Sequence, residues 1–164
     1  MTPTDVLIRL VAALAVGGAL GLNRDLHRKP AGVRTIGIVS LGSAMLTMAA
    51  GTVPPGQLAN MGVSPIISGI LTGIGFLGAG VIVRGETANS IHGLTTAAII
   101  WFAAGIGILA GLGEWVELTI ATVLVFIIMI FGGRFERWIN AAFEPVGLAA
   151  ASKAKETQEV GTSS

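Results

Sequence analysis

The stretch SGILTGIGFLGAGVIVR, residues 68–84, is an apolar run of about membrane-spanning length that ends in a single arginine. Five glycines fall within residues 69–80. In a water-exposed helix each glycine costs roughly 1 kcal/mol relative to alanine. Inside a bilayer, small residues instead allow two helix backbones to approach closely. The run therefore predicts a transmembrane helix that packs against another helix.

A helical wheel separates the small residues of this run from the large ones. One side carries the small residues, interrupted only by Phe76: Ser68, Gly69, Thr72, Gly73, Gly75, Ala79 and Gly80. The opposite side carries Ile70, Leu71, Ile74, Leu77 and Val81. We expect the small side to contact a helix and the aliphatic side to contact lipid. The G-x-G-x-x-G pattern that ends at Gly78 follows no strand, so we expect no dinucleotide site.

Composition places the chain among membrane proteins. It has 164 residues, of which 52% are hydrophobic and 12% charged, and its mean hydropathy is +0.81. The absence of cysteine excludes disulfides, thiolate zinc sites and cysteine nucleophiles. Apolar runs long enough to span a bilayer, or at the short edge of that length, occupy residues 6–22, 35–51, 65–83, 91–112 and 115–133.

These runs predict an all-α polytopic transmembrane bundle of about five helices in residues 1–133. We expect a short amphipathic interfacial helix over residues 134–146 and a disordered tail over residues 147–164. Nine of the ten Lys and Arg residues flank the spans on one side. The positive-inside rule makes that side the cytoplasm, with the amino terminus outside and the carboxyl terminus inside. The first run is no cleaved signal, because its basic cluster follows the apolar residues.

Small residues recur in other predicted helices. Gly17 and Gly21 lie four residues apart in the first, and Gly93 opens a similar stripe in the fourth. We expect the first, third and fourth helices to form the compact centre, with the bulky fifth helix at the periphery.

The distribution of ionisable residues limits the chemistry. No Asp or Glu lies in the middle of a span, which disfavours a pump or a proton-coupled carrier. The sequence does not exclude a transport path lined by backbone carbonyls. Two histidines cannot form a three-histidine metal site. No buried base accompanies the threonines, so we expect no enzyme, and we expect no cofactor and no nucleic-acid partner.

Two arginines need partners. Arg34 lies at the start of the second helix, where a cation opposes the helix dipole. Its partner is anionic lipid, a fixed ion pair with Asp25 or Glu86, or a bound anion. Arg9 either pairs with Asp5 and extends to the outer interface, or contacts another helix or a lipid headgroup.

The start of the fourth helix holds further polar groups. Asn89 or Ser90 is expected to cap it. The hydroxyls of Thr95 and Thr96 are expected to bond a backbone carbonyl or a neighbouring helix rather than a substrate. We expect His92 to lie at an interface between helices rather than to act as a ligand.

Four strings resemble the MgtC/SapB family of bacterial inner-membrane proteins: GLNRDL (21–26), KPAGVRT (29–35), TGIGFLGAGVIVR (72–84) and HGLTTAA (92–98). The resemblance covers residues 6–133 approximately. It implies a multi-pass domain linked to growth under magnesium limitation, to virulence and to regulation of partner membrane proteins. The signature positions carried over are Arg24, Asp25, Arg34, Thr35, Gly75, Gly78, Gly80, Arg84, Gly93, Thr95 and Thr96. Asn23 stands where many members have glutamate, and Pro65 where an arginine is expected.

We therefore expect a multi-pass protein of the bacterial inner membrane that modulates ion or magnesium homeostasis, or a partner membrane protein, through helix–helix association. It would act as a homo-oligomer or with another membrane protein. The alternative is a channel or carrier for magnesium or another small solute, using hydroxyls and carbonyls between the third and fourth helices.

Overall fold

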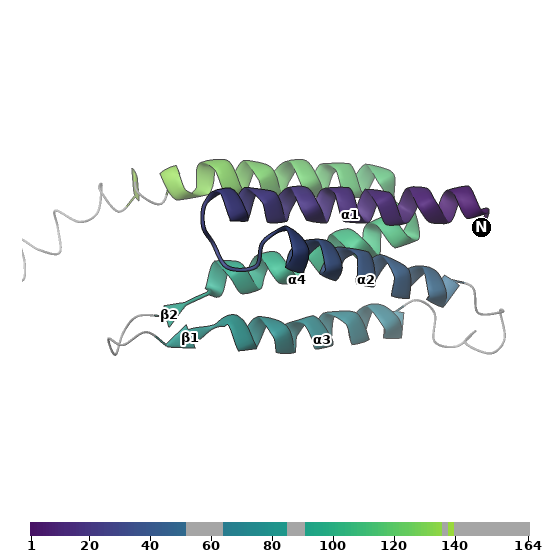
Figure 1. The fold of residues 1–164 in the computed structure, drawn as a ribbon, viewed down its shortest axis with the longest axis horizontal. Helices are drawn as coiled ribbons and strands as arrows, with labels where there is room; N and C mark the ends of the chain where they lie inside the picture. The colour runs from purple at the N-terminus through teal and green to yellow at the C-terminus, as the bar shows by residue number, and fades with distance from the viewer. Residues whose placement is uncertain (52–63, 85–90, 136–137, 140–164) are drawn as a thin grey trace, which may run out of the picture. The chain divides into compact units, whose positions relative to one another are not determined.

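The computed structural model describes residues 1–51, 64–84, 91–135 and 138–139 (Figure 1). The chain forms two compact units, Met1–Thr122 and Val123–Ser164. The helices are α1 (Pro3–Leu26), α2 (Val33–Gly51), α3 (Ser64–Val81) and α4 (Leu94–Leu112), followed by a helix over Trp115–Phe135. A two-residue antiparallel ladder of β1 (Val83–Arg84) and β2 (Ile91–His92) joins the end of α3 to the start of α4.

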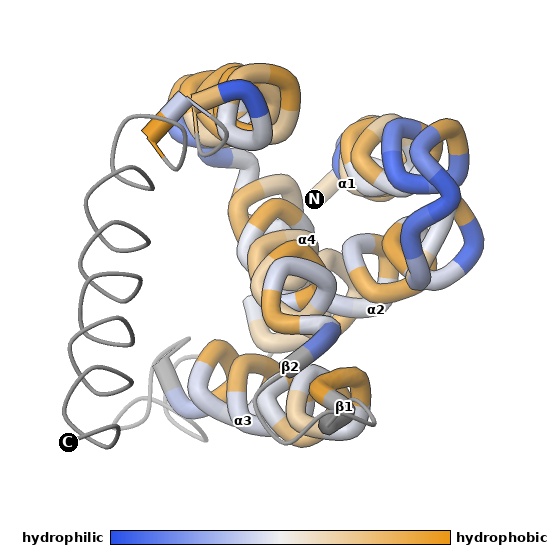
Figure 2. The backbone as a smooth tube through the Cα atoms, turned by 90° about the vertical axis from the view of Figure 1, so that its left-hand side faces the viewer, coloured by the Kyte–Doolittle hydropathy of each residue, from blue (hydrophilic) through white to orange (hydrophobic). Residues whose placement is uncertain are grey.

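The predicted all-α transmembrane bundle is confirmed. The described residues contain four helices long and apolar enough to cross a membrane, namely α1, α2, α4 and Trp115–Phe135. The apolar part of α3, Pro65–Val81, is shorter. Each observed helix end lies within four residues of the predicted one. The chain is thus a multi-pass membrane protein, and Figure 2 shows hydrophobic residues along its described helices.

Two helix starts differ from the sequence expectation. The first helix begins earlier, because Thr2 and Asp5 form a capping box in which the Thr2 hydroxyl accepts from the Asp5 N–H at 3.2 Å. The fourth begins later, and the prediction that Asn89 or Ser90 caps it was wrong. Its N-cap is Gly93, which has φ +93° and no side-chain cap. A Cβ at Gly93 would overlap the Val81 carbonyl oxygen, so this glycine allows α3 and α4 to meet closely.

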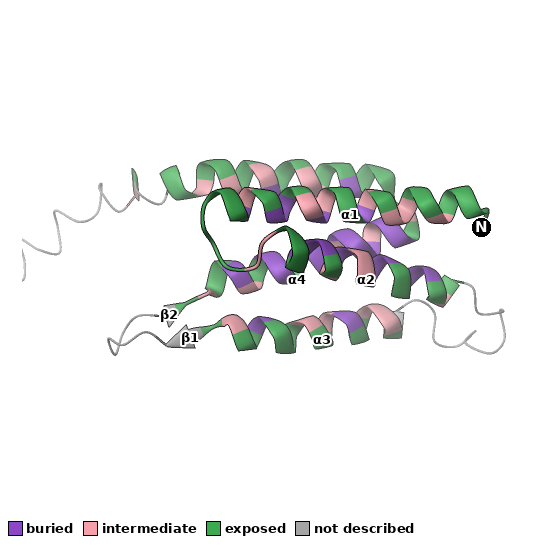
Figure 3. Ribbon diagram, in the orientation of Figure 1, coloured by how far each residue is buried: buried purple, intermediate pink, exposed green. Residues whose placement is uncertain are grey.

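The centre of the first unit is formed by α1, α2 and α4. Helix α2 packs against both α1 and α4, while α3 packs mainly against α4 and barely against α2. The expectation that α3 belongs to the centre was wrong, and α2 takes its place. Figure 3 shows the buried residues concentrated on α4 and on parts of α1 and α2.

Close packing explains why α2 is central. A Cβ at Gly17 of α1 would lie 2.6 Å from the Ser40 Cβ, and one at Gly111 of α4 would lie 2.9 Å from the Thr47 Cβ. Ser40 also donates through its hydroxyl to the Ala13 carbonyl at 2.9 Å. Small and hydroxyl residues of α2 therefore meet glycines on both neighbouring helices, which is how membrane helices gain packing energy.

The carboxyl-terminal unit is described only in part. The helix that starts at Trp115 continues through Arg134 to Phe135, past the boundary expected at residue 133. Phe135 and Trp138 stack with ring centroids 6.1 Å apart. The rest of the predicted interfacial helix (136–137 and 140–146) and the tail (147–164) lie outside the described residues.

Candidate functional site: a polar clamp and an uncovered helix face

A buried arginine joins α1, the turn that follows it and α4. Arg24 is 3% exposed. Its Nε donates to the Pro30 carbonyl at 2.9 Å and to the Ala31 carbonyl at 3.1 Å. Its Nη2 donates to Thr96 Oγ1 at 2.6 Å. Hydrogen bonds from a charged donor are about twice as strong as neutral ones, so this group, which we call the Arg24 clamp, ties the turn to the start of α4.

The next residue fixes the other side of the turn. The Asp25 carboxylate accepts from the Val33 N–H at 2.9 Å and so satisfies the first turn of α2. A Cβ at Gly32 would overlap this carboxylate. Helix α1 ends in a Schellman arrangement, in which the Arg28 N–H donates to the Asp25 carbonyl and Arg28 takes φ +52°. The motif residues Arg24 and Asp25 thus determine the shape of the α1–α2 turn, which is the most hydrophilic part of the first unit in Figure 2.

Four other polar residues singled out in the sequence lie outside this clamp. Arg34 and Thr35 are exposed in the first turn of α2, and the Arg34 side chain makes no hydrogen bond or ion pair with the described residues. Thr95 is exposed beside the buried Thr96, and His92 is exposed in β2. The backbone of Arg84 lies in β1 opposite Ile91, and its side chain lies outside the description. The structure therefore brings Arg24 and Thr96 together and leaves Arg34, Thr35, Thr95 and His92 outside the clamp. An Asp25–Arg34 ion pair is not formed.

At the opposite end of the bundle Arg9 contacts another helix. Its Nη1 donates to the Gly111 carbonyl at 2.6 Å, near the carboxyl end of α4, where a cation is favoured by the helix dipole. Gly113, with φ +84°, ends α4, and a Cβ there would lie 2.6 Å from Arg9 Nη2. Of the two sequence-based readings of Arg9, the geometry supports the interhelical one. Nothing in the sequence identified Gly111 as its partner.

The predicted packing glycines fall into two groups. Gly17, Gly21 and Gly93 lie against neighbouring atoms, and Gly78 meets the Ala97 Cβ at an ordinary 3.5 Å. A Cβ at Gly69, Gly73, Gly75 or Gly80 would have none of the described residues within 4 Å. The four open glycines all belong to α3.

Helix α3 is oriented opposite to the expectation. Most of its large aliphatic side chains point inward: Ile70, 8% exposed, packs with Ala104 and Ile108 of α4, while Ile66, Ile67, Leu71 and Ile74 surround this cluster. Leu77 is the exception and is 51% exposed. Its small residues are exposed, apart from Gly78, which is buried against Ala97. We call this exposed set the outer face of α3, and it consists of Ser68, Gly69, Thr72, Gly73, Gly75, Phe76, Ala79 and Gly80. Phe76 is 81% exposed and is the large residue that protrudes from it.

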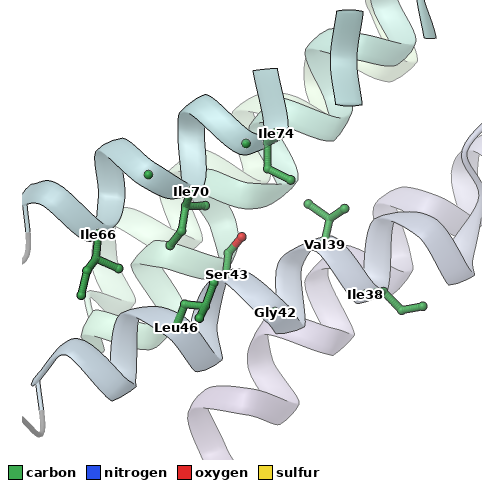
Figure 4. Close-up of a pocket in the computed structure, with 10 residues that line it drawn as sticks. Ile38, Val39, Gly42, Ser43, Leu46, Ile66, Ile70 and Ile74 are labelled. Carbon is green, nitrogen blue, oxygen red and sulfur yellow. The ribbon is translucent and has the colours of Figure 1, made fainter. Parts of the chain in front are cut away.

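An apolar groove adjoins the outer face. It has a volume of about 490 Å³ and lies between α2 and α3. Figure 4 shows Ile66, Ile70 and Ile74 directed from α3 toward α2 across this groove. Gly69 and Gly73 line it as well, so they border both the groove and the outer face. Among the described residues no group of three or more His, Cys, Asp or Glu side chains could hold a metal ion.

Comparisons with known proteins point to one family. The family model described as MgtC family matches residues 10–138. Protein MgtC of Salmonella typhimurium is 39% identical over 119 residues, covering 73% of this chain and 48% of that protein. Protein SapB of Bacillus subtilis is 37% identical, covering 86% of this chain and 60% of its own length. Protein SrpB of Synechococcus elongatus is 35% identical, covering 83% and 80%.

The chain spans about half the length of the first of these relatives. No solved structure matches it.

Proposed function

The chain belongs to the MgtC family and is a multi-pass membrane protein, and from this premise we propose that it modulates ion or magnesium homeostasis in the bacterial inner membrane by helix–helix association. The association uses the outer face of α3. Its target is a membrane helix, belonging to a second copy or to a partner membrane protein.

The observation that carries this proposal is the inverted orientation of α3. Lipid tails are as apolar as isoleucine, so an isolated helix gains little by turning its aliphatic side inward and its glycines outward. Exposed glycines also expose the polar backbone to hydrocarbon and forgo side-chain packing. An approaching helix removes both penalties, because it reaches the backbone of Gly69, Gly73 and Gly80 without steric conflict.

The transport alternative has less support. It starts from the hydroxyls near the beginning of α4, but Thr96 is bonded to Arg24 and Thr95 is exposed. The hydroxyls of Ser40 and Thr47, inside the bundle, bond backbone carbonyls within close-packed interfaces. The described residues therefore offer no continuous line of free polar groups to a solute.

A complementation experiment tests the proposal. Cells lacking the gene are grown at low magnesium with the wild-type protein, with Gly73→Leu, or with Gly18→Leu. Gly18 is the matched control, because a Cβ there also meets nothing within 4 Å but it lies on α1. Gly73→Leu should insert normally and fail to restore growth, whereas Gly18→Leu should restore it. Full complementation by Gly73→Leu would refute the role of the outer face.

A further inference from the structure

We propose that the groove between α2 and α3 binds an anionic phospholipid. The phosphate of this lipid contacts Arg34 and Thr35 at the start of α2, and its acyl chains lie between the two helices. The site goes beyond the helix-binding role of the outer face of α3. It gives Arg34 the anionic partner that its side chain does not find among the described residues.

The groove has the dimensions of hydrocarbon chains rather than of a helix. Along α2 its lining runs from Ile38 to Leu46, which is about 12 Å of helix axis. A volume of about 490 Å³ over this length corresponds to a cross-section of about 40 Å². A helix with its side chains is about 10–12 Å wide and needs at least about 80 Å². Hydrocarbon chains pack with their carbons about 4 Å apart and need about 16 Å² each, so they fit.

The lining of the groove matches hydrocarbon in chemistry. Apart from Ser43 it consists of aliphatic side chains and glycines, and Figure 4 shows three isoleucines of α3 directed toward α2. Leu46 is 49% exposed beside the groove, which is therefore accessible from the bilayer. Helices α2 and α3 barely contact each other. An acyl chain between them gives the groove walls the dispersion contacts that the two helices do not give each other.

A cation and a hydroxyl lie at the amino-terminal end of the groove. Thr35 shares a face of α2 with Val39 and Gly42, which follow it by four and seven positions and line the groove. Arg34 is its neighbour, and both side chains are exposed. A cation at a helix amino terminus opposes the helix dipole. A bound phosphate removes this conflict and accepts charge-assisted hydrogen bonds from the guanidinium, so the charge favours an anionic lipid.

The depths of the charge and the groove match those of one phospholipid. Ile38 lies four residues beyond Arg34, which is about 6 Å along the axis. The polar interfacial layer of one leaflet is about 5–7 Å thick, so a phosphate at Arg34 brings the chains to the groove at Ile38. The lining ends at Leu46, about 18 Å from Arg34. One leaflet including its headgroups is about 20 Å deep, so the whole site lies within a single leaflet.

Photolabelling of the full chain in liposomes tests the site. The probe is phosphatidylglycerol with a diazirine in one acyl chain, added to phosphatidylcholine liposomes. Phosphatidylcholine with the same chain is the matched probe, and peptide mass spectrometry identifies the labelled residues. We expect the phosphatidylglycerol probe to label the residues that line the groove about fivefold more than the matched probe, because one arginine near the surface gives about this preference for an anionic lipid.

Two pairs of variants separate the charge from the groove. Arg34→Gln should lower labelling by the phosphatidylglycerol probe about fivefold, to the level of the matched probe, whereas Lys29→Gln in the preceding turn should lower it less than twofold. Gly42→Leu should lower groove labelling by both probes about tenfold, because the leucine occupies the groove without touching the outer face of α3. Gly18→Leu on α1 should leave it unchanged. A Cβ at either glycine meets none of the described residues within 4 Å, so both variants are expected to fold.

Equal labelling of the groove by the two probes, or phosphatidylglycerol labelling that survives Arg34→Gln, would overturn the lipid site. A preference that disappears when inorganic phosphate replaces chloride at constant ionic strength would assign Arg34 to a free anion and would also overturn it. These measurements involve neither growth nor a partner helix. Their failure therefore leaves the proposed function standing, and failure of the complementation experiment leaves the lipid site standing.

Discussion

One added methyl group at Gly107 should destabilise the bundle. A Cβ at this position of α4 would overlap the Ser40 carbonyl oxygen of α2 and lie 2.8 Å from the Ser43 Cβ. Carbon atoms pack best about 3.5–4.0 Å apart, so Gly107→Ala forces α2 and α4 apart by about 1 Å. Roughly 20 close atom pairs at about 0.15 kcal/mol each would then lose a quarter to a half of their attraction, or about 1 kcal/mol. Strain from overpacking brings the expected loss to about 1–3 kcal/mol.

Gly105→Ala on the same helix is the matched control. Nothing among the described residues lies within 4 Å of a Cβ at Gly105. Alanine is also the better helix former, so the free energy of unfolding should stay unchanged or rise by about 0.5 kcal/mol. Both variants are unfolded by titrating sodium dodecyl sulfate into a mild detergent, with tryptophan fluorescence as the signal. Equal loss of unfolding free energy in the two variants would refute the packing argument.

Three further substitutions test the contacts at the two ends of the bundle. Thr96→Val should lower the unfolding free energy by about 1 kcal/mol, since the buried Arg24 loses one acceptor, and Thr96→Ser should restore most of it in the same detergent titration. Gly113→Ala should cost about 1–2 kcal/mol, and less when Arg9 is also replaced by alanine, because part of the cost is overlap with that guanidinium; a double-mutant cycle measures the difference. Gly21→Ala should cost about 1–3 kcal/mol because its Cβ would lie 2.5 Å from the Val33 Cα, and limited proteolysis of the α1–α2 turn should accelerate.

The sequence was sufficient to locate each of the apolar helices in the described residues. A bilayer requires about 20 consecutive apolar residues, and that requirement leaves a clear signal in the chain. Helix ends were less predictable, because they depend on caps. The capping box at Thr2 extends α1, and Gly93 starts α4 by its left-handed backbone.

Which helices pack together could not be predicted from small residues alone. The glycines of α3 outnumber those of α1, but the centre is completed by α2, whose contacting residues include Ser40 and Ser43. A hydroxyl residue can pack as closely as glycine when its hydroxyl bonds a backbone carbonyl. The wheel of α3 separated its two faces except at Leu77, which is 51% exposed, but it could not say which face was turned inward.

The polar site was partly visible in the sequence. Arg24 and Thr96 were both singled out, but their contact joins residues 72 positions apart and depends on how α1 and α4 pack. No sequence pattern distinguished Arg24 from Arg34 as the buried arginine. The fold of the α1–α2 turn determines which arginine is buried, because only Arg24 lies where the Pro30 and Ala31 carbonyls converge.

The position of α3 outside the α1–α2–α4 core has a consequence for how such a chain can change. Its outer face touches none of the glycines and hydroxyls that hold the core together, so substitutions at Thr72, Phe76 or Ala79 carry little penalty in folding. Specificity for one neighbour over another can therefore drift, or be redesigned, on this face while the scaffold stays the same. In the function proposed here, the stable part of the molecule and the part that selects a partner are separate sets of residues.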